Sequence, residues 1–190
     1  VPLGSTIESY ARELRATGDY AYVEPDWLLY PALTPDDPLF PSQWHHPVIE
    51  SEAAWDRTVG SPTIVCAVCD TGIDHAHPDL APVLVEGADA SGLGPALPES
   101  EGGVAEDAVG HGTAVAGCIG AAGDNAEGVS GIGWDLRLMP VRVSDAPSGS
   151  APLSSILKGA RWAAENGAQI INCSYEGVSS PSVQSTGAYV

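Results

Sequence analysis

The sequence is poor in basic side chains. Its 190 residues include 7 Lys and Arg against 25 Asp and Glu, which gives a formal net charge of −18. Nucleic acid and anionic membrane surfaces carry charge of the same sign, so neither is expected as a partner. The sequence also lacks any apolar run close to the ~20 residues that a membrane helix needs. No basic and apolar leader opens the chain, although its start at Val1 instead of Met means that a targeting segment could have been lost.

Cysteine is scarce as well, with four in the chain: Cys66, Cys69, Cys118 and Cys173. The first two form a C-x-x-C pattern, which in other proteins holds zinc or carries redox chemistry. Here the pair lies inside the apolar run 64–69, which is predicted to be a strand. Positions three apart on a strand face opposite sides of a sheet, so these two thiols are not expected to chelate one ion. We interpret them as small buried hydrophobic side chains.

Residues 1–35 are predicted to form a separate segment. A helix is expected over 7–17, and the aromatic, partly alternating stretch 20–30 predicts one strand. Four prolines and two acidic residues within 31–41 then predict an extended linker. The remaining residues, 36–190, are therefore expected to form a second domain.

From residue 36 onward the pattern alternates between strands and helices. Strands are expected at 64–69, 137–143 and 169–173, and helices at 51–59, 110–122 and 153–166. The first strand is a continuous apolar run, which is typical of a strand buried on both faces of a parallel sheet. Pro140 argues against a fully paired central position for the second strand, and Ser51 is the expected N-cap of the first helix. Strand–helix repeats of this length imply right-handed crossovers, so we predict an α/β fold with a parallel sheet and helices on both faces.

Polar residues follow these strands at the edge where open parallel sheets place their active sites. Asp70 follows the first strand, Ser174 follows the third, and His111 lies where a glycine-rich loop enters a helix. A carboxylate at a buried strand end can bind an imidazole N–H, fix its tautomer and stabilise the imidazolium. Gly110 and Gly112 let the backbone pass close to the histidine. Alone, Asp70 could cap a turn and His111 could be a surface histidine, but together these features favour a catalytic pair.

Two long motifs surround this pair. One reads Val-Cys-Asp-Thr-Gly-Ile-Asp over 68–74, followed by His-Pro-Asp-Leu over 77–80, and the other reads Gly-His-Gly-Thr-Ala-Val-Ala-Gly over 110–117. Together they resemble the subtilisin-like serine proteases, the subtilase family. The resemblance implies a three-layer subtilisin-like α/β fold with Asp70 as the triad acid and His111 as the general base. It also likens residues 20–30 to the last strand of the family's inhibitory propeptide.

The family's third catalytic residue is not found in this chain. In subtilases the order along the chain is Asp, His and then Ser. No serine after His111 lies in a Gly-Thr-Ser-x-x-x-Pro motif, and the Ala-Gly-Asn run of the oxyanion hole is absent too. The chain is therefore expected to be the N-terminal part of a protease, with a fold incomplete at its C-terminus. Without a nucleophile, these 190 residues alone should be inactive.

Four residues after the third strand are expected to bind substrate. Ser174 matches a family binding position and not the nucleophile. The family's Leu-Gly that follows is replaced here by Tyr175, Glu176 and Gly177. Tyr175 is expected to fill a substrate subsite, and Glu176 either attracts a basic side chain or is simply solvated.

Two metal interpretations are open. His75, His77 and Asp79 form an H-x-H-x-D pattern of zinc-dependent hydrolases. That enzyme class is less favoured, because Leu80 stands where a further histidine should follow and the motif around His111 stays unexplained. Calcium fits the resemblance better, since Asp79 matches one family position and Asp124, in the loop after the histidine helix, approximates a second.

These observations predict a serine-type endopeptidase in the complete protein. By the resemblance it is secreted or extracellular, acts on protein or peptide substrates and is bound by its own propeptide, residues 1–35. The alternative is a catalytically dead, truncated or pseudoprotease chain that serves as a binding module. The intact Asp and His motifs argue against a long-standing loss of catalysis.

Overall fold

The computed structural model describes residues 1–26, 33–92, 105–107, 109–176 and 180–190. The chain forms two compact units, Val1–Pro31 and Ala32–Val190. Within the described residues, no helix has both the length and the apolar character needed to cross a membrane.

The first unit contains the predicted helix, α1 (Ile7–Thr17). Thr6 and Ser9 start it with a capping box, because the side chain of each accepts from the backbone N–H of the other. Gly18 ends it in a left-handed conformation with φ of 76°.

The strand predicted over 20–30 is wrong in its described part. Residues 20–26 form no strand, and residues 27–30 lie outside the described part of the chain. A strand needs the backbone of a neighbouring strand as its hydrogen-bonding partner. The described residues of this unit offer only the helix α1, from which Arg15 donates a side-chain hydrogen bond to the Val23 carbonyl.

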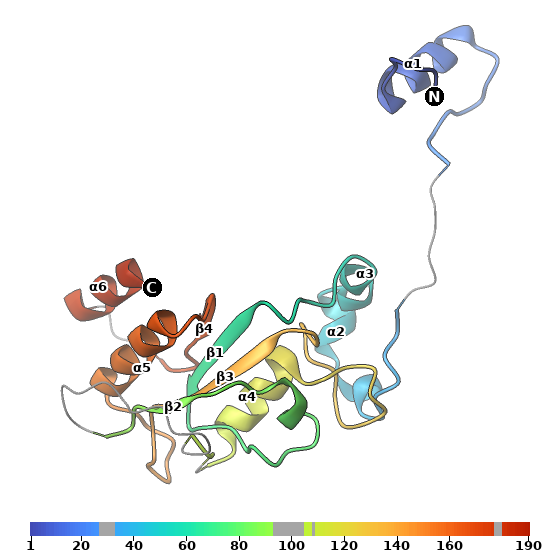
Figure 1. Ribbon diagram of the computed structural model, residues 1–190. Coiled ribbons are helices and arrows are strands. Elements are labelled where there is room, and N and C mark those ends of the chain that lie inside the picture. Colours follow the sequence, from blue (N-terminus) through green and yellow to red (C-terminus); the bar gives the residue numbers. More distant parts are fainter. Residues whose placement is uncertain (27–32, 93–104, 108, 177–179) are drawn as a thin grey trace. The chain divides into compact units, whose positions relative to one another are not determined.

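The second unit is built around a four-stranded parallel sheet in the order β2-β3-β1-β4. Its strands are β1 (Val65–Asp70), β2 (Ala88–Asp89), β3 (Arg137–Arg142) and β4 (Ile170–Asn172). Helices α4 (His111–Gly120) and α5 (Leu153–Glu165) cover its two faces (Figure 1). This arrangement confirms the predicted α/β fold with a parallel sheet between two helical layers.

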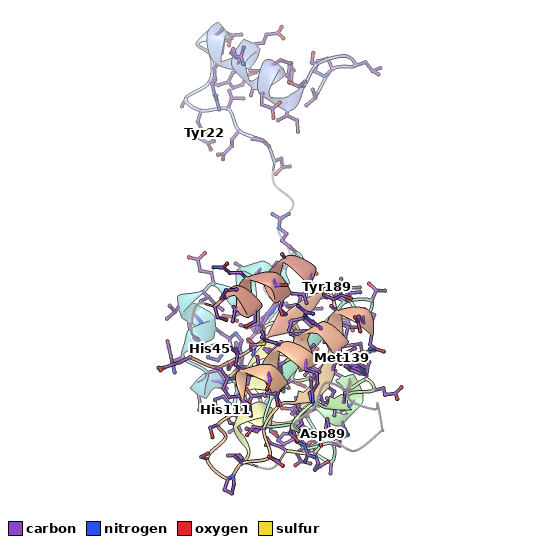
Figure 2. The ribbon with its side chains drawn as sticks, turned by 90° about the vertical axis from the view of Figure 1, so that its left-hand side faces the viewer. Tyr22, His45, Asp89, His111, Met139 and Tyr189 are labelled. Atoms are coloured by element: carbon purple, nitrogen blue, oxygen red, sulfur yellow. The ribbon has the colours of Figure 1, made fainter. Side chains whose placement is uncertain are left out.

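Alternation along β1 divides the core into two clusters. Ala67 and Cys69 pack on the α5 side together with Met139, which is labelled in Figure 2. Cys66 and Val68 pack on the α4 side. The two cysteines of the C-x-x-C pattern are therefore buried and lie on opposite faces of the sheet, as the strand pattern predicted.

Pro140 lies inside the sheet after all, because β3 has β1 on one side and β2 on the other. The backbone N–H groups of Arg137 and Val143 point toward β1. The nitrogen of Pro140, at an intervening even position, therefore faces the other side. The missing N–H of Pro140 therefore removes no bond from the β1–β3 ladder. On the β2 side the pairing is already interrupted at this point, between an isolated bridge at Leu84 and the two residues of β2.

Helix boundaries differ most near residue 51. The helix predicted over 51–59 is only α3 (Ser51–Trp55), and its N-cap is Glu50, with φ of 56°, and not Ser51. The Ser51 side chain is instead engaged with the ring of His46. The pattern did not predict the following helices: η1 (Phe40–Ser42), α2 (His45–Val48), η2 (Ala81–Val83) and α6 (Pro181–Tyr189).

His46, in α2, is fully buried against aromatic rings. Its ring centroid lies 4.9 Å from that of Trp55 and 5.3 Å from that of Phe40. Nε2 lies 3.0 Å from the carbonyl oxygen of Ser130, and Nδ1 lies 2.9 Å from the Ser51 hydroxyl. A carbonyl only accepts, so Nε2 carries the hydrogen, and the hydroxyl can donate to Nδ1 of a neutral ring. Burial is the main cause that lowers the pKa of His46 below its ordinary 6.5.

We therefore expect the second unit to lose stability as the pH falls below the ordinary pKa of 6.5. Below pH 6.5 and above the lowered pKa of the folded state, the unfolded chain binds a proton at His46 and the folded chain does not. The contribution of neutral His46 to the free energy of unfolding is therefore complete above pH 6.5 and is lost on acidification. His45 adds to this lowering, and Glu52 opposes it. Urea midpoints measured from about pH 8 to about pH 5 test this, with His46→Gln expected to give the flatter profile. If the urea midpoint fell equally with pH in the parent chain and in His46→Gln, this expectation would be contradicted.

Candidate active site

The end of β1 and the start of α4 bring Asp70 and His111 into contact. Asp70 is the last residue of β1 and is buried. His111, which is labelled in Figure 2, is the first residue of α4 and has 54 % of its side chain exposed. His111 Nδ1 lies 2.7 Å from Asp70 Oδ1. Because an ionised carboxylate only accepts, Nδ1–H is the donor. Nε2, across the ring, is then the nitrogen left to accept a proton.

Glycine at position 112 permits this close approach. A Cβ atom there would overlap the carbonyl oxygen of Gly72 and lie 3.1 Å from Asp70 Cβ. A side chain would therefore push α4 away from the end of β1. Gly110, directly before the helix, has φ of 99°, which favours glycine as well.

A second contact joins the strand end to the helix. The hydroxyl oxygen of Thr71 accepts a hydrogen bond of 2.9 Å from Gly112 N. Thr71 N in turn donates to Asp70 Oδ1 at 2.8 Å. The same Asp70 oxygen thus receives both the backbone of Thr71 and the ring of His111, and this orients the carboxylate toward the imidazole.

The expected substrate-binding residues follow β4, at the same edge of the sheet as Asp70. Ser174 is exposed, and its hydroxyl accepts from Asn172 Nδ2 at 2.9 Å. Glu176 is also exposed, and Gly177 lies outside the described residues.

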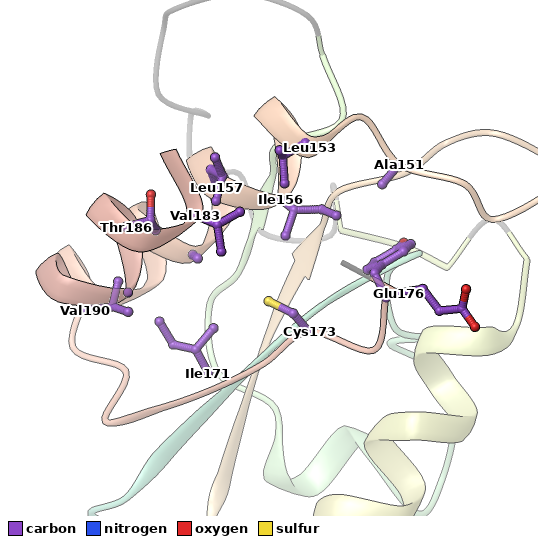
Figure 3. A pocket seen from close by; sticks show the side chains of 13 residues that line it. Ala151, Leu153, Ile156, Leu157, Ile171, Cys173, Glu176, Val183, Thr186 and Val190 are labelled. Carbon is purple, nitrogen blue, oxygen red and sulfur yellow. The ribbon is translucent and has the colours of Figure 1, made fainter. Parts of the chain in front are cut away.

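Tyr175 is the part of this segment that is held in place. Its hydroxyl donates to the carbonyl oxygen of Gly149 at 3.1 Å. Burial, followed by the nearby charge of Asp70, raises the pKa of Tyr175 to about 12. Tyr175 and Glu176 line an apolar pocket between α5, β4 and α6 (Figure 3).

The zinc interpretation of His75, His77 and Asp79 is wrong. The described residues contain no group of three or more His, Cys, Asp or Glu side chains placed to hold one metal ion. His77 Nδ1 instead accepts from the backbone nitrogen of Asp79 at 3.3 Å.

Asp79 is buried against the loop that follows α4. Its Oδ1 accepts from Asn125 Nδ2 at 3.0 Å, and its Oδ2 accepts from Val129 N at 2.8 Å. Asp124 is exposed and reaches this region through its backbone nitrogen, which donates to Asp37 at 2.8 Å. Asp37, a second buried carboxylate beside the loop, was not among the predicted site residues.

Residues 61–188 match the family model described as the subtilase family. The chain belongs to this family. It is 34 % identical over 171 residues to a thermophilic serine proteinase of Bacillus sp. strain AK1, covering 88 % of this chain and 40 % of that protein. A protease from Pseudoalteromonas arctica has a solved structure similar to this one, with a TM-score of 0.70 and 29 % identity, over 83 % of this chain and 56 % of that chain.

Other relatives of this subtilase chain carry names that differ in location. An extracellular protease of Xanthomonas campestris is 32 % identical, over 90 % of this chain and 34 % of that protein. A major intracellular serine protease of Bacillus subtilis is 35 % identical, over 70 % of this chain and 40 % of that protein. The chain spans less than half the length of each of these curated relatives.

Asp107 is the residue of this subtilase site that the sequence analysis missed. Its Oδ1 accepts from Thr71 Oγ1 at 2.8 Å and from the backbone nitrogens of Val109 and Gly110 at 2.9 and 2.8 Å. Its Oδ2 accepts from Thr113 N at 2.9 Å. Burial alone would raise the pKa of Asp107, but these hydrogen bonds outweigh burial and lower it to about 2. An acidic residue just before a helix start is the signal that could have identified it.

Proposed function

We propose that this subtilase chain supplies the acid and the base of a serine endopeptidase, the activity that the complete protein performs on protein or peptide substrates. The 2.7 Å contact between His111 Nδ1 and Asp70 Oδ1 carries the proposal, because it leaves Nε2 as the proton acceptor. The names of the relatives, which include several serine proteinases, support the reaction class.

In this mechanism His111 Nε2 takes the proton of a serine hydroxyl as that oxygen attacks the peptide carbonyl. The imidazolium then donates the same proton to the leaving amine. Asp70 keeps the ring in the required tautomer and stabilises the imidazolium, and the low exposure of Asp70 strengthens this interaction. We propose that the serine and the side-chain donor of the oxyanion hole come from a part of the complete protein outside these 190 residues, because neither motif occurs among them.

We further propose that Ser174 pairs with the substrate backbone while Tyr175, Glu176 and Gly177 border its side chains. The position of β4 beside β1 supports this, because residues after β4 follow the same sheet edge as Asp70. Glu176 would favour substrates with a basic side chain in the adjoining subsite.

The complete protein tests the proposed function against the alternative of a binding module. A serine endopeptidase should be inactivated by a fluorophosphonate probe that labels one serine, and this labelling should require His111. An intact protein that binds peptides but neither cleaves them nor reacts with the probe would establish the pseudoprotease.

Residues 1–35 are proposed to be the end of an inhibitory propeptide that is removed on maturation of a secreted enzyme. The division of the chain into the compact units Val1–Pro31 and Ala32–Val190 supports this, as does the extracellular relative. Sequencing the N-terminus of the mature protein measures it directly, and a mature start before Tyr20 would contradict it.

Calcium is proposed as a structural cofactor bound at Asp79. Two buried carboxylates, Asp37 and Asp79, face the loop after α4, and carboxylates and loop carbonyls are the ligands that calcium prefers. Asp124 fits less well, because its exposed carboxylate makes no hydrogen bond within the described residues.

Millimolar calcium is accordingly expected to raise the melting temperature, since an ion bound only by the folded state stabilises it. Asp79→Asn should remove most of this rise, and Asp124→Asn should reduce it if its carboxylate is a ligand. Asp135→Asn, at an exposed site elsewhere in the chain, is the control. A rise that is the same in all these variants would exclude the site.

A further inference from the structure

Cys69 and Cys173 lie side by side at the ends of two paired strands. β1 and β4 run parallel, and Val68 is the partner of Asn172, so Cys69 and Cys173 are next in register. Neighbouring strands lie ~4.8 Å apart, within the ~4.4–6.8 Å between Cα atoms that a disulfide spans. Ala67 and its partner Ile171, two residues earlier, both pack on the α5 side of the sheet. The two thiols share that face.

The two thiols differ in access. Cys69 is fully buried, whereas Cys173 is exposed and lines a pocket of about 380 Å³ between α5, β4 and α6. Figure 3 shows the Cys173 sulfur pointing into this pocket. The walls are mainly aliphatic and include the following side chains: Leu153, Ile156, Leu157, Ile171 and Val183. A small molecule in the pocket therefore meets Cys173 first.

The interaction between the thiols separates their reactivities. The closeness of the two thiols lowers the pKa of Cys173 and raises the pKa of Cys69, which burial raises further. The thiolate is the nucleophile in thiol chemistry. Cys173 is exposed and lines the pocket, so it is the attacking thiol, and the buried Cys69 is placed to react second.

We propose that Cys69 and Cys173 form a thiol–disulfide exchange site that accepts a small disulfide from the pocket and closes into a Cys69–Cys173 disulfide. The Cys173 thiolate attacks one sulfur of the small disulfide, whose S–S bond breaks and releases one thiolate. Cys69 then gives up its proton, attacks the Cys173 sulfur and expels the second thiolate. Two protein thiols are oxidised to one disulfide, and one small disulfide is reduced to two thiols.

Charge selects among small disulfides. Glu176 lies on the pocket lining, and the whole chain has a net charge of −18. Both repel anions, so neutral and cationic disulfides react faster than anionic ones. The closed bridge would link the residue before Asp70 to the residue before Ser174. Oxidation of the two thiols would therefore add a covalent constraint between two strand ends of the candidate active site.

The experiment uses the 190-residue chain carrying Cys118→Ser, which removes the other exposed thiol. It is run at a protein concentration low enough that light scattering shows no self-association. Dipyridyl disulfide, a neutral reagent that releases a coloured thione, should yield two equivalents of thione per chain. The protein mass should fall by two hydrogens, and a digest should join the peptides that contain Cys69 and Cys173. Adding Cys69→Ser should stop the reaction at one equivalent, with a stable mixed disulfide on Cys173.

Cys66 is the matched control within the same strand. It is buried on the opposite face of β1, and burial raises the pKa of this thiol to about 11. It should stay reduced while Cys69 is oxidised. Reaction of Cys66 as fast as Cys69, or two separate mixed disulfides without a link, would overturn the proposal. Oxidised glutathione, an anion, should react several-fold more slowly than the cation cystamine, and equal rates would overturn the charge selection.

Discussion

In the complete protein, which we propose to be a serine endopeptidase, a His111→Ala variant is expected to lose several orders of magnitude in kcat. The methyl group of alanine can neither accept the serine proton nor return it to the leaving amine, so both proton transfers lose their catalyst. The loss should appear in kcat more than in KM, because the base acts on the serine hydroxyl and contributes little to substrate binding. Initial rates over a range of peptide concentrations give kcat and KM separately and measure both effects.

Two further variants test whether the loss of kcat is specific to the Asp70–His111 pair. Asp70→Asn should also lower kcat strongly, because an amide can hold the imidazole in the wrong tautomer; losses of this kind are on the order of 10⁴-fold. His45→Gln changes a histidine that does not contact Asp70, so this variant enzyme should keep the kcat of the parent. A His111→Ala enzyme that retains more than a tenth of the kcat would show that another group is the base.

The 190-residue chain alone is expected to hydrolyse no peptide at all. Covalent acyl transfer needs a nucleophile within hydrogen-bond reach of its base. Among the described residues, no serine hydroxyl makes a hydrogen bond with His111, whose ring contacts Asp70 instead. A fluorophosphonate probe should therefore label no serine stoichiometrically. Probe labelling together with turnover that disappears in His111→Ala would mean that the nucleophile lies within these residues.

The same chain should also self-associate when it is made alone. Within the described residues β4 pairs only with β1, and Ile170 on β4 is 49 % exposed. An unpaired strand edge beside an apolar pocket invites pairing with another copy. Light scattering that rises with protein concentration would report this association, and Ile170→Lys should reduce it. A monomer that stays stable at high concentration would contradict this expectation.

Sequence patterns predicted those features of the candidate site that are determined by residues adjacent in the chain. The apolar run before Asp70 and the glycines around His111 were sufficient to predict a strand end and a helix start at one edge of a parallel sheet. Asp107 was missed because its role depends on a hydroxyl 36 residues earlier in the chain. Ser51 failed as an N-cap for a similar reason: the buried ring of His46, which no local pattern reveals, engages its hydroxyl.

Residues 20–30 show a second limit of sequence-based prediction, in which a strand is predicted but does not form in its described part. Its aromatic alternation describes one face of a strand, but the existence of a strand is decided by a partner backbone elsewhere. β4 has such a partner in β1 and forms with only three residues. Residues 20–26 have none within the described part of their unit and stay irregular.

The carboxylate of Asp107 gathers three backbone amides, those of Val109, Gly110 and Thr113, around one charged group. In amide hydrogen exchange these three protons should not behave as independent reporters. Their exchange requires the same event, the departure of one carboxylate, so they should share a common opening rate and lose protection together. With the pKa of Asp107 at about 2, the charge persists far below neutrality. The junction between the loop and the histidine helix should therefore stay closed in acid long after ordinary surface carboxylates have become neutral.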